Sequence, residues 1–162
     1  MTEPAGEAVQ RSIDVDAPAD VVWNLVSDLP AMGAISPENR GGRWLRGATG
    51  PATGARFRGR NRRGWRRWST VVEVVTCEPG RSFAFDVSSV GLRVSRWTYD
   101  VAPRGTSGCT VTESWQDRRG RLMNLIGLVA TGVAHDAAQT AAGIEQTLAS
   151  LKSRAESVTH PA

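Results

Sequence analysis

The sequence has few of the residues on which metal sites and enzyme active sites most often depend. Its 162 residues include two cysteines, two histidines, one tyrosine and one lysine. Cys77 and Cys109 match no metal-binding spacing, and His135 and His160 lie far from both in the sequence. Phosphate-binding loops and dinucleotide fingerprints are also missing. We therefore predict buried, reduced thiols, no metal and no cofactor.

Long apolar runs are missing as well. The longest, residues 125–133, is far short of the roughly 20 residues that span a bilayer, so we expect no transmembrane segment. Residues 1–7 contain neither a basic region nor an apolar run, which argues against a secretory signal. We expect a cytoplasmic protein with one domain over residues 8–157 and short flexible tails at 1–7 and 158–162.

Negative charge is missing from one long stretch. Between Arg40 and Arg67 the chain contains ten arginines and no Asp or Glu, although its net charge is only +4. Within that stretch Arg56, Arg58 and Arg60 alternate with Phe and Gly, as on one face of a strand. Residues 61–64 are typical of a turn, so residues 56–67 are predicted to form an arginine-rich hairpin, with Arg66 on its returning strand.

Three interpretations of this hairpin stay open. It could be a solvated outer face, with Trp65 and Trp68 turned into the core and arginine stems covering them. It could make transient contact with an anionic ligand or an anionic membrane surface. It could bind nucleic acid, since arginine holds phosphate and indoles stack on bases. We expect no stable nucleic-acid complex, because nineteen Arg against one Lys indicates a GC-rich genome more than a selected site.

Helices are predicted near both ends of the chain. Pro18 fits the first turn of a helix that runs to Asp28, and residues 29–37 form a second short helix or turn. Helical spacing of apolar residues recurs over 122–129, and a long helix is expected over 133–157. His135 and Asp136 open that helix but point in different directions, so they form no ready-made catalytic pair.

Almost everything between these helices is predicted to be strand. Ile13 and Val15 alternate in a first strand, and alternation with Gly, Pro and Asn breaks predicts further strands over 42–45, 55–60, 66–77, 82–88, 92–102 and 109–116. The short breaks favour hairpins in sequence order, a meander. In 66–77 valines occupy both parities, so the inward face of that strand is not determined by the pattern.

Several segments resemble the START-like superfamily, also called SRPBCC. They are residues 16–23 (Asp-Ala-Pro-Ala-Asp-Val-Val-Trp), 36–38 (Ser-Pro-Glu), 83–85 (Phe-Ala-Phe), 97–99 (Trp-Thr-Tyr), 110–115 (Thr-Val-Thr-Glu-Ser-Trp) and 147–152 (Thr-Leu-Ala-Ser-Leu-Lys). The resemblance extends over roughly residues 8–152 and is greatest to the polyketide cyclase/dehydrase and lipid-transport-like branch. It implies an α+β helix-grip fold, in which a curved antiparallel sheet of about seven strands wraps around a long C-terminal helix, with two short helices after the first strand.

The resemblance also implies a ligand class. Such proteins enclose an apolar tunnel, and we expect a carrier or sensor that binds a hydrophobic small molecule, lipid or polyketide-like. A polyketide cyclase or dehydratase using the same pocket is the alternative, and we favour binding because the chain has few catalytic side chains. The predicted lining consists of Phe83, Phe85, Trp97, Tyr99, Val111, Glu113, Trp115 and Ile144.

Strand parity draws attention to Glu113. Val111, Glu113 and Trp115 share one face, so Glu113 points inward if the apolar face is concave. A carboxyl group there needs a raised pKa, a basic partner or a ligand to receive, and with Tyr99 it is a candidate general acid or base. The structural alternative is that Glu113 lies at a strand bulge or pairs with an arginine such as Arg96.

Overall fold

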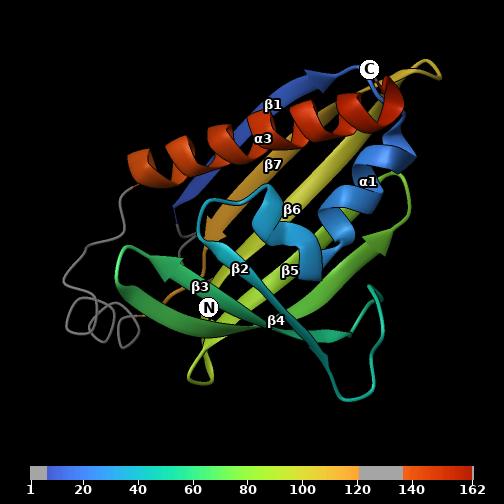
Figure 1. Ribbon diagram of the computed structural model, residues 1–162. Helices are drawn as coiled ribbons and strands as arrows, with labels where there is room; N and C mark the ends of the chain where they lie inside the picture. Colours follow the sequence, from blue (N-terminus) through green and yellow to red (C-terminus); the bar gives the residue numbers. More distant parts are fainter. Residues whose placement is uncertain (1–6, 121–136, 162) are drawn as a thin grey trace, which may run out of the picture.

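The computed structural model describes residues 7–120 and 137–161 of the chain. It contains one antiparallel sheet and helices at both ends of the sequence (Figure 1). The elements in order are β1 (Ala8–Val15), α1 (Ala19–Ser27), the 3-10 helix η1 (Leu29–Ala34), β2 (Asn39–Leu45), β3 (Arg56–Arg63), β4 (Arg66–Glu78), β5 (Ser82–Ser89), β6 (Leu92–Arg104), β7 (Gly108–Asp117) and α3 (Ala137–Thr159).

The sheet has seven strands in the order β1-β7-β6-β5-β4-β3-β2. From β2 to β7 each strand pairs with the next in antiparallel fashion, which confirms the predicted meander. β1 pairs with β7 instead of with β2. The first and last strands of the chain are therefore neighbours. The two edge strands of the sheet are β1 and β2.

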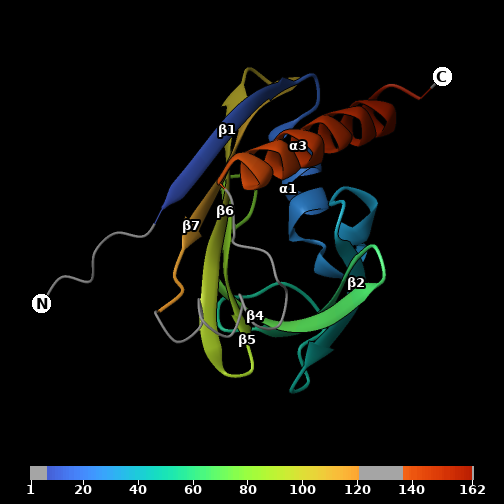
Figure 2. The ribbon, with the colours of Figure 1, turned by 90° about the vertical axis from the view of Figure 1, so that its left-hand side faces the viewer.

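The sheet is strongly curved, and the helices lie within its concave side (Figure 2). Register shifts interrupt three ladders, between Asn39 and Gly42, between Val74 and Thr76, and between Val87 and Ser88. Such bulges bend and twist a strand locally, which allows the sheet to wrap around α3. The α+β helix-grip architecture expected from the resemblance is thus confirmed.

The indole of Trp23 anchors α1 to the sheet. Pro18 precedes the helix, whose buried face includes Val22, Trp23 and Val26. The Nε1–H of Trp23 donates a hydrogen bond of 3.1 Å to the carbonyl oxygen of Ser82 in β5. Its ring also meets Phe83 edge to face, with 6.3 Å between centroids. The predicted first helix therefore covers the end of the sheet where β5 begins.

The long helix α3 buries one stripe against the sheet. Ala141, Ile144, Leu148, Leu151 and Ala155 recur at helical spacing and are all buried. The predicted helical turns at 122–129, the predicted helix start at 133, and the pair at 135 and 136 lie outside the described residues. No helix in the described ranges has the length and apolar character needed to cross a membrane.

Candidate ligand-binding site

The strand register places most of the predicted lining residues in two rows across the concave face. In one row Phe83 pairs with Tyr99, and Tyr99 pairs with Glu113. In the next row Phe85 pairs with Trp97, and Trp97 with Trp115; Val101 and Val111 continue the same face. Paired residues project to the same side of a sheet, so residues from β5, β6 and β7 form one continuous surface.

Nearly all of this surface is buried. Phe83, Val111 and Ile144 are fully buried, Phe85, Tyr99 and Trp115 nearly so, and Trp97 is half-buried. The rings of Phe83 and Phe85 lie 5.8 Å apart. The predicted set thus lies together on the face toward α3, from which Ile144 projects. A tunnel through this region stays a prediction.

Among the lining residues named above, Glu113 is the one with a carboxyl group. Its side chain is 1% exposed. The Tyr99 hydroxyl donates a hydrogen bond of 2.9 Å to Glu113 Oε1, whereas Oε2 is buried and has no hydrogen-bond partner among the described residues. The geometry therefore joins the two candidate catalytic residues and leaves one carboxyl oxygen unsatisfied.

Among the described residues, the structural alternative for Glu113 finds neither a bulge nor an arginine partner. β7 pairs with β1 and with β6 in an unbroken register, so no bulge occurs at Glu113. Arg96 has the parity of the outer face, where its Nε lies 2.6 Å from Asp86 Oδ1. Because the two side chains project from opposite faces of the sheet, Arg96 cannot neutralise Glu113.

Burial determines the protonation of this pair. Desolvation raises the pKa of Glu113 to about 8, and the hydrogen bond from Tyr99 only partly offsets that effect. Burial, followed by the neighbouring Glu113, raises the pKa of Tyr99 well above its usual value. At neutral pH the Glu113 carboxyl group is therefore mainly neutral, and it can donate a hydrogen bond as well as accept one.

Sequence reasoning missed Arg11, which shares the Glu113 row. Arg11 pairs with Glu113 in the β1–β7 register, but its Nε lies 3.0 Å from Glu145 of α3. The alternation of Val9, Ile13 and Val15 would have given Arg11 the same inward parity. Its charge is directed to the half-exposed rim, so Glu113 keeps an apolar setting.

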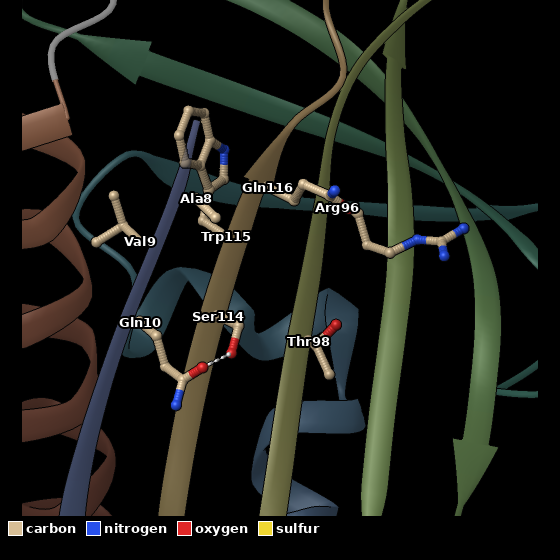
Figure 3. A pocket seen from close by; sticks show the side chains of 8 residues that line it. All are labelled: Ala8, Val9, Gln10, Arg96, Thr98, Ser114, Trp115 and Gln116. Carbon is tan, nitrogen blue, oxygen red and sulfur yellow. Dashed lines mark hydrogen bonds between the residues drawn. The ribbon is translucent and has the colours of Figure 1, made fainter. Parts of the chain in front are cut away.

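A second concavity lies on the outer face of the sheet and differs in chemistry (Figure 3). It is a groove of about 210 Å³ lined from β1, β6 and β7 by Ala8, Val9, Gln10, Arg96, Thr98, Ser114, Trp115 and Gln116. Ser114 Oγ and Gln10 Oε1 are joined across it by a hydrogen bond of 3.4 Å. The guanidinium of Arg96 is held by Asp86. This open groove lies apart from the buried surface around Glu113, so it is not the enclosed site that a hydrophobic ligand favours.

The arginine-rich hairpin presents arginines on both of its faces. The β3–β4 register places Arg56, Arg58, Arg60 and Arg62 on the outer face, with Arg67 opposite Arg62. Arg66 pairs with Arg63 and has the opposite parity, so Arg66 does not share the face of the other predicted basic residues. Arg56 is held by Glu73, with Nε 2.8 Å from Oε2.

Trp65 is not turned into the core, contrary to the first interpretation of the hairpin, whereas Trp68 has the inward parity of Val72 but stays partly exposed. Trp65 is 83% exposed and Trp68 is 38% exposed. The guanidinium carbon of Arg66 lies 5.2 Å from the centroid of the Trp65 ring, a cation–π arrangement. The exposed indole is at the turn between β3 and β4, outside both strands.

Metal-binding chemistry finds no support among residues 7–120 and 137–161. No group of three or more His, Cys, Asp or Glu side chains there is arranged to hold an ion. Cys109 is buried and Cys77 half-buried, both are free thiols, and burial raises the pKa of each. Such thiols are poor nucleophiles and poor metal ligands at neutral pH.

Comparison with known proteins gives a consistent result. The sequence profile of the family described as polyketide cyclase/dehydrase and lipid transport matches residues 7–156. No curated protein sequence matches this chain significantly.

Known structures agree with that match. A polyketide-cyclase-like protein from Corynebacterium glutamicum is 28% identical, with a TM-score of 0.65 over 98% of this chain and 96% of that one. A START superfamily protein from Mycobacterium smegmatis is 16% identical, with a TM-score of 0.70 over 94% and 99% of the two chains. A Streptomyces aromatase/cyclase is 18% identical, with a TM-score of 0.67 over 96% of each chain. The resemblance seen in the sequence is confirmed.

Proposed function

Because the chain belongs to the polyketide cyclase/dehydrase and lipid transport family, we propose that it binds a hydrophobic small molecule between α3 and the concave face of the sheet, as a carrier or sensor. The ligand is a lipid or a polyketide-like compound that carries at least one oxygen atom. Burial of its apolar surface, at about 25 cal/mol per Å², supplies most of the affinity.

The observation that carries this proposal is the unsatisfied Oε2 of Glu113. A buried carboxyl oxygen without a partner is energetically costly, and native proteins retain such groups mainly where something else completes them. A pKa near 8 leaves a proton on the group at neutral pH. Glu113 can then donate to a carbonyl or hydroxyl oxygen of the ligand, while Tyr99 holds the other carboxyl oxygen in place.

The surface around Glu113 restricts which other groups the ligand can carry. Phe83, Phe85 and Trp115 supply aromatic walls, and Ile144 supplies an aliphatic contact from α3. None of these four side chains offers a charge, so a ligand with a second charged group near Glu113 would lose its hydration without compensation. The site favours an extended or fused-ring apolar molecule with one oxygen placed against Glu113.

Mass spectrometry tests this function directly. Native spectra of the gently purified protein should show an added mass, and denaturation should release a lipophilic compound. Tyr99→Phe and Glu113→Gln should lower the occupied fraction, because each removes one part of the polar contact. Thr98→Val is the matched control: it lies next to Tyr99 but has outer-face parity, so occupancy should not change. A protein that is empty and binds no fluorescent fatty acid would contradict the proposal.

The same geometry supports a cyclase or dehydratase as a second candidate. The specific observation is the raised pKa of Glu113, since a carboxyl group that keeps its proton near neutral pH can serve as a general acid. Tyr99 lies within hydrogen-bond reach of it. The walls of the site would then control how a flexible chain folds before reaction.

A turnover assay distinguishes a carrier from an enzyme. The released compound should be recovered unchanged after incubation with fresh protein if the protein is a carrier. Conversion to a dehydrated or cyclised product, lost in Glu113→Gln while binding persists, would establish the enzyme instead. Loss of both binding and conversion in Glu113→Gln, with an unaltered fold, would support the orienting role of Glu113 in either function.

A further inference from the structure

The arginine-rich hairpin carries a group of arginines without ion-pair partners among the described residues, although Arg62 Nε donates a hydrogen bond of 2.8 Å to the carbonyl oxygen of Gly64. On its outer face are Arg58, Arg60, Arg62 and Arg67, and Arg43 of β2 joins them by pairing with Arg58. All five are exposed, and none forms an ion pair with any residue in the described ranges. Five uncompensated cations on one surface repel each other and attract polyanions.

The turn between β3 and β4 adds an apolar group to this charge. Trp65 is 83% exposed there. The arginine on the strand after it, Arg66, places its guanidinium 5.2 Å from the indole centroid. A large exposed indole with cations beside it is the composition found where proteins meet the headgroup region of a bilayer.

The positions of the tryptophans and arginines in the hairpin favour a lipid surface over nucleic acid as the binding partner. A single strand of nucleic acid would need stacking indoles and phosphate-binding arginines along one groove. Here Trp68 pairs with Asn61 and has the parity opposite to that of Arg60 and Arg67, and Arg66 covers one face of Trp65. The aromatic rings and the outer arginines therefore do not line a common groove.

Binding to a lipid surface requires a different arrangement of apolar and charged groups. A hairpin that enters a headgroup layer by its tip needs an apolar group at the tip and cations on both sides of it. Trp65 is at the turn, Arg62 and Arg67 pair with each other on one face, and Arg66 lies on the other face. The described residues of the hairpin tip have this arrangement.

We propose that the β3–β4 hairpin docks on an anionic lipid surface, with Trp65 entering the headgroup layer and the arginines on both hairpin faces contacting lipid phosphates. Arg63, on the inner face of the hairpin, ties the tip to the rest of the protein, because it is bonded to Glu38 and its Nη1 lies 3.4 Å from Gln139 of α3. The docking is electrostatic and reversible, and salt weakens it. It does not depend on the interior ligand.

Vesicle sedimentation tests the docking. The full-length protein is mixed with vesicles of phosphatidylcholine alone, or of equal parts phosphatidylcholine and phosphatidylglycerol, at low and at high salt. It should sediment with the mixed vesicles at low salt only. The double variant Arg60→Glu, Arg67→Glu should bind at least about thirtyfold more weakly, and Trp65→Ala should also bind more weakly.

The matched control reverses two arginines elsewhere. Arg81→Glu with Arg154→Glu changes the net charge by the same amount at exposed positions outside the hairpin, so vesicle binding should fall far less. Circular dichroism verifies the fold of each variant, and Arg60→Gln with Arg67→Gln replaces the double reversal if that variant does not fold. Equal losses in hairpin and control variants would overturn the proposal, since they would indicate a net-charge effect.

A single-stranded oligonucleotide is the competing probe. If the protein retains the oligonucleotide and ignores the mixed vesicles, or binds neither, the lipid-docking proposal is wrong. Binding to both, with the oligonucleotide insensitive to Trp65→Ala and the vesicles sensitive to it, supports lipid docking. Because no interior ligand is involved, these results do not depend on the outcome for the carrier function.

Discussion

At the scale of single residues, Glu113 is where stability and the proposed function conflict. An ionisable group that is 1% exposed and has one oxygen without a partner opposes folding whenever it ionises. Its apolar neighbours would pack against a leucine or methionine more favourably. The Tyr99 hydrogen bond holds the carboxyl group in one orientation, but it does not remove the desolvation that raises the pKa of Glu113 to about 8.

This conflict predicts a pH-dependent stability difference between the protein and Glu113→Gln. The pKa of Glu113 is raised on folding, so the folded state binds the proton more tightly than the unfolded state, and the contribution of Glu113 is most favourable at low pH. Stability should fall as pH rises from near the unfolded pKa to about 8. Glu113→Gln should escape that loss, with a gain on the order of several kcal/mol above this range.

Urea unfolding at several pH values measures this difference. Glu78→Gln is the control for the chemical change itself, since Glu78 is exposed and the buried Glu113 carboxyl group stays in place. A constant difference between the protein and Glu113→Gln from acid to alkaline pH would contradict the assigned burial of the carboxyl group.

At the scale of elements, the contact between β2 and β3 depends on a glycine. A Cβ built on Gly42 would lie 2.0 Å from the carbonyl oxygen of Arg58 and 2.7 Å from ring atoms of Phe57. Phe57 is buried and meets Trp44 edge to face, with centroids 5.3 Å apart. The close approach of β2 brings this aromatic pair into the core, so only glycine fits at Gly42.

Gly42→Ala should therefore separate β2 from β3 and destabilise the protein by about 3 kcal/mol or more, because backbone must move to relieve the overlap. Gly50→Ala is the matched control: it has open space around its Cβ and no positive φ, so its effect should stay within about 0.5 kcal/mol. Urea midpoints of the two variants provide the comparison. Equal stability of Gly42→Ala and Gly50→Ala would show that β2 does not pack as described.

At the scale of the whole molecule, the two halves of the sheet differ in burial. β7 alternates buried and half-buried residues through most of its length, and β5 is buried from Phe83 to Phe85 and half-buried elsewhere. By contrast, the parts of β3 and β4 next to their common turn are mostly exposed, from Arg60 to Arg63 and from Arg66 to Ser69. Local opening needs less free energy where fewer apolar groups leave the core.

Hydrogen exchange should therefore be graded across the sheet. We expect the slowest exchange in central β5, β6 and β7, around Phe83, Tyr99 and Val111, and faster exchange in the β3–β4 end. Mass spectrometry of peptides after exchange for increasing times measures this order. Uniform protection across all strands would contradict it and would indicate a single cooperative unit. Vesicles containing phosphatidylglycerol should slow exchange at the β3–β4 end only.

Local sequence patterns alone determined much of the fold of this protein. Alternation in residues 110–115 gave Glu113 its inward direction, and the spacing of Ile144, Leu148 and Leu151 gave α3 its buried stripe. The short turns between strands determined the meander from β2 to β7. These features follow from the periods of strand and helix, which depend on neighbours in the sequence and not on distant contacts.

Only the tertiary structure decided the rest. The pairing of β1 with β7 joins segments about a hundred residues apart, and no local pattern specifies such a partner. The register shift between Val74 and Thr76 changes parity within β4: Val72 and Val74 point inward before the shift, and Cys77 points inward after it. Alternation counted along the sequence therefore cannot give one inward face for the whole strand. The exposure of Trp65 depends on where its turn lies beyond the sheet, and the partner of Arg96 depends on the neighbouring strand. The sequence thus determined which faces α3 and β7 bury, whereas strand partners, bulges, the inward face of β4 and exposed turns were decided by contacts that form only when the whole chain folds.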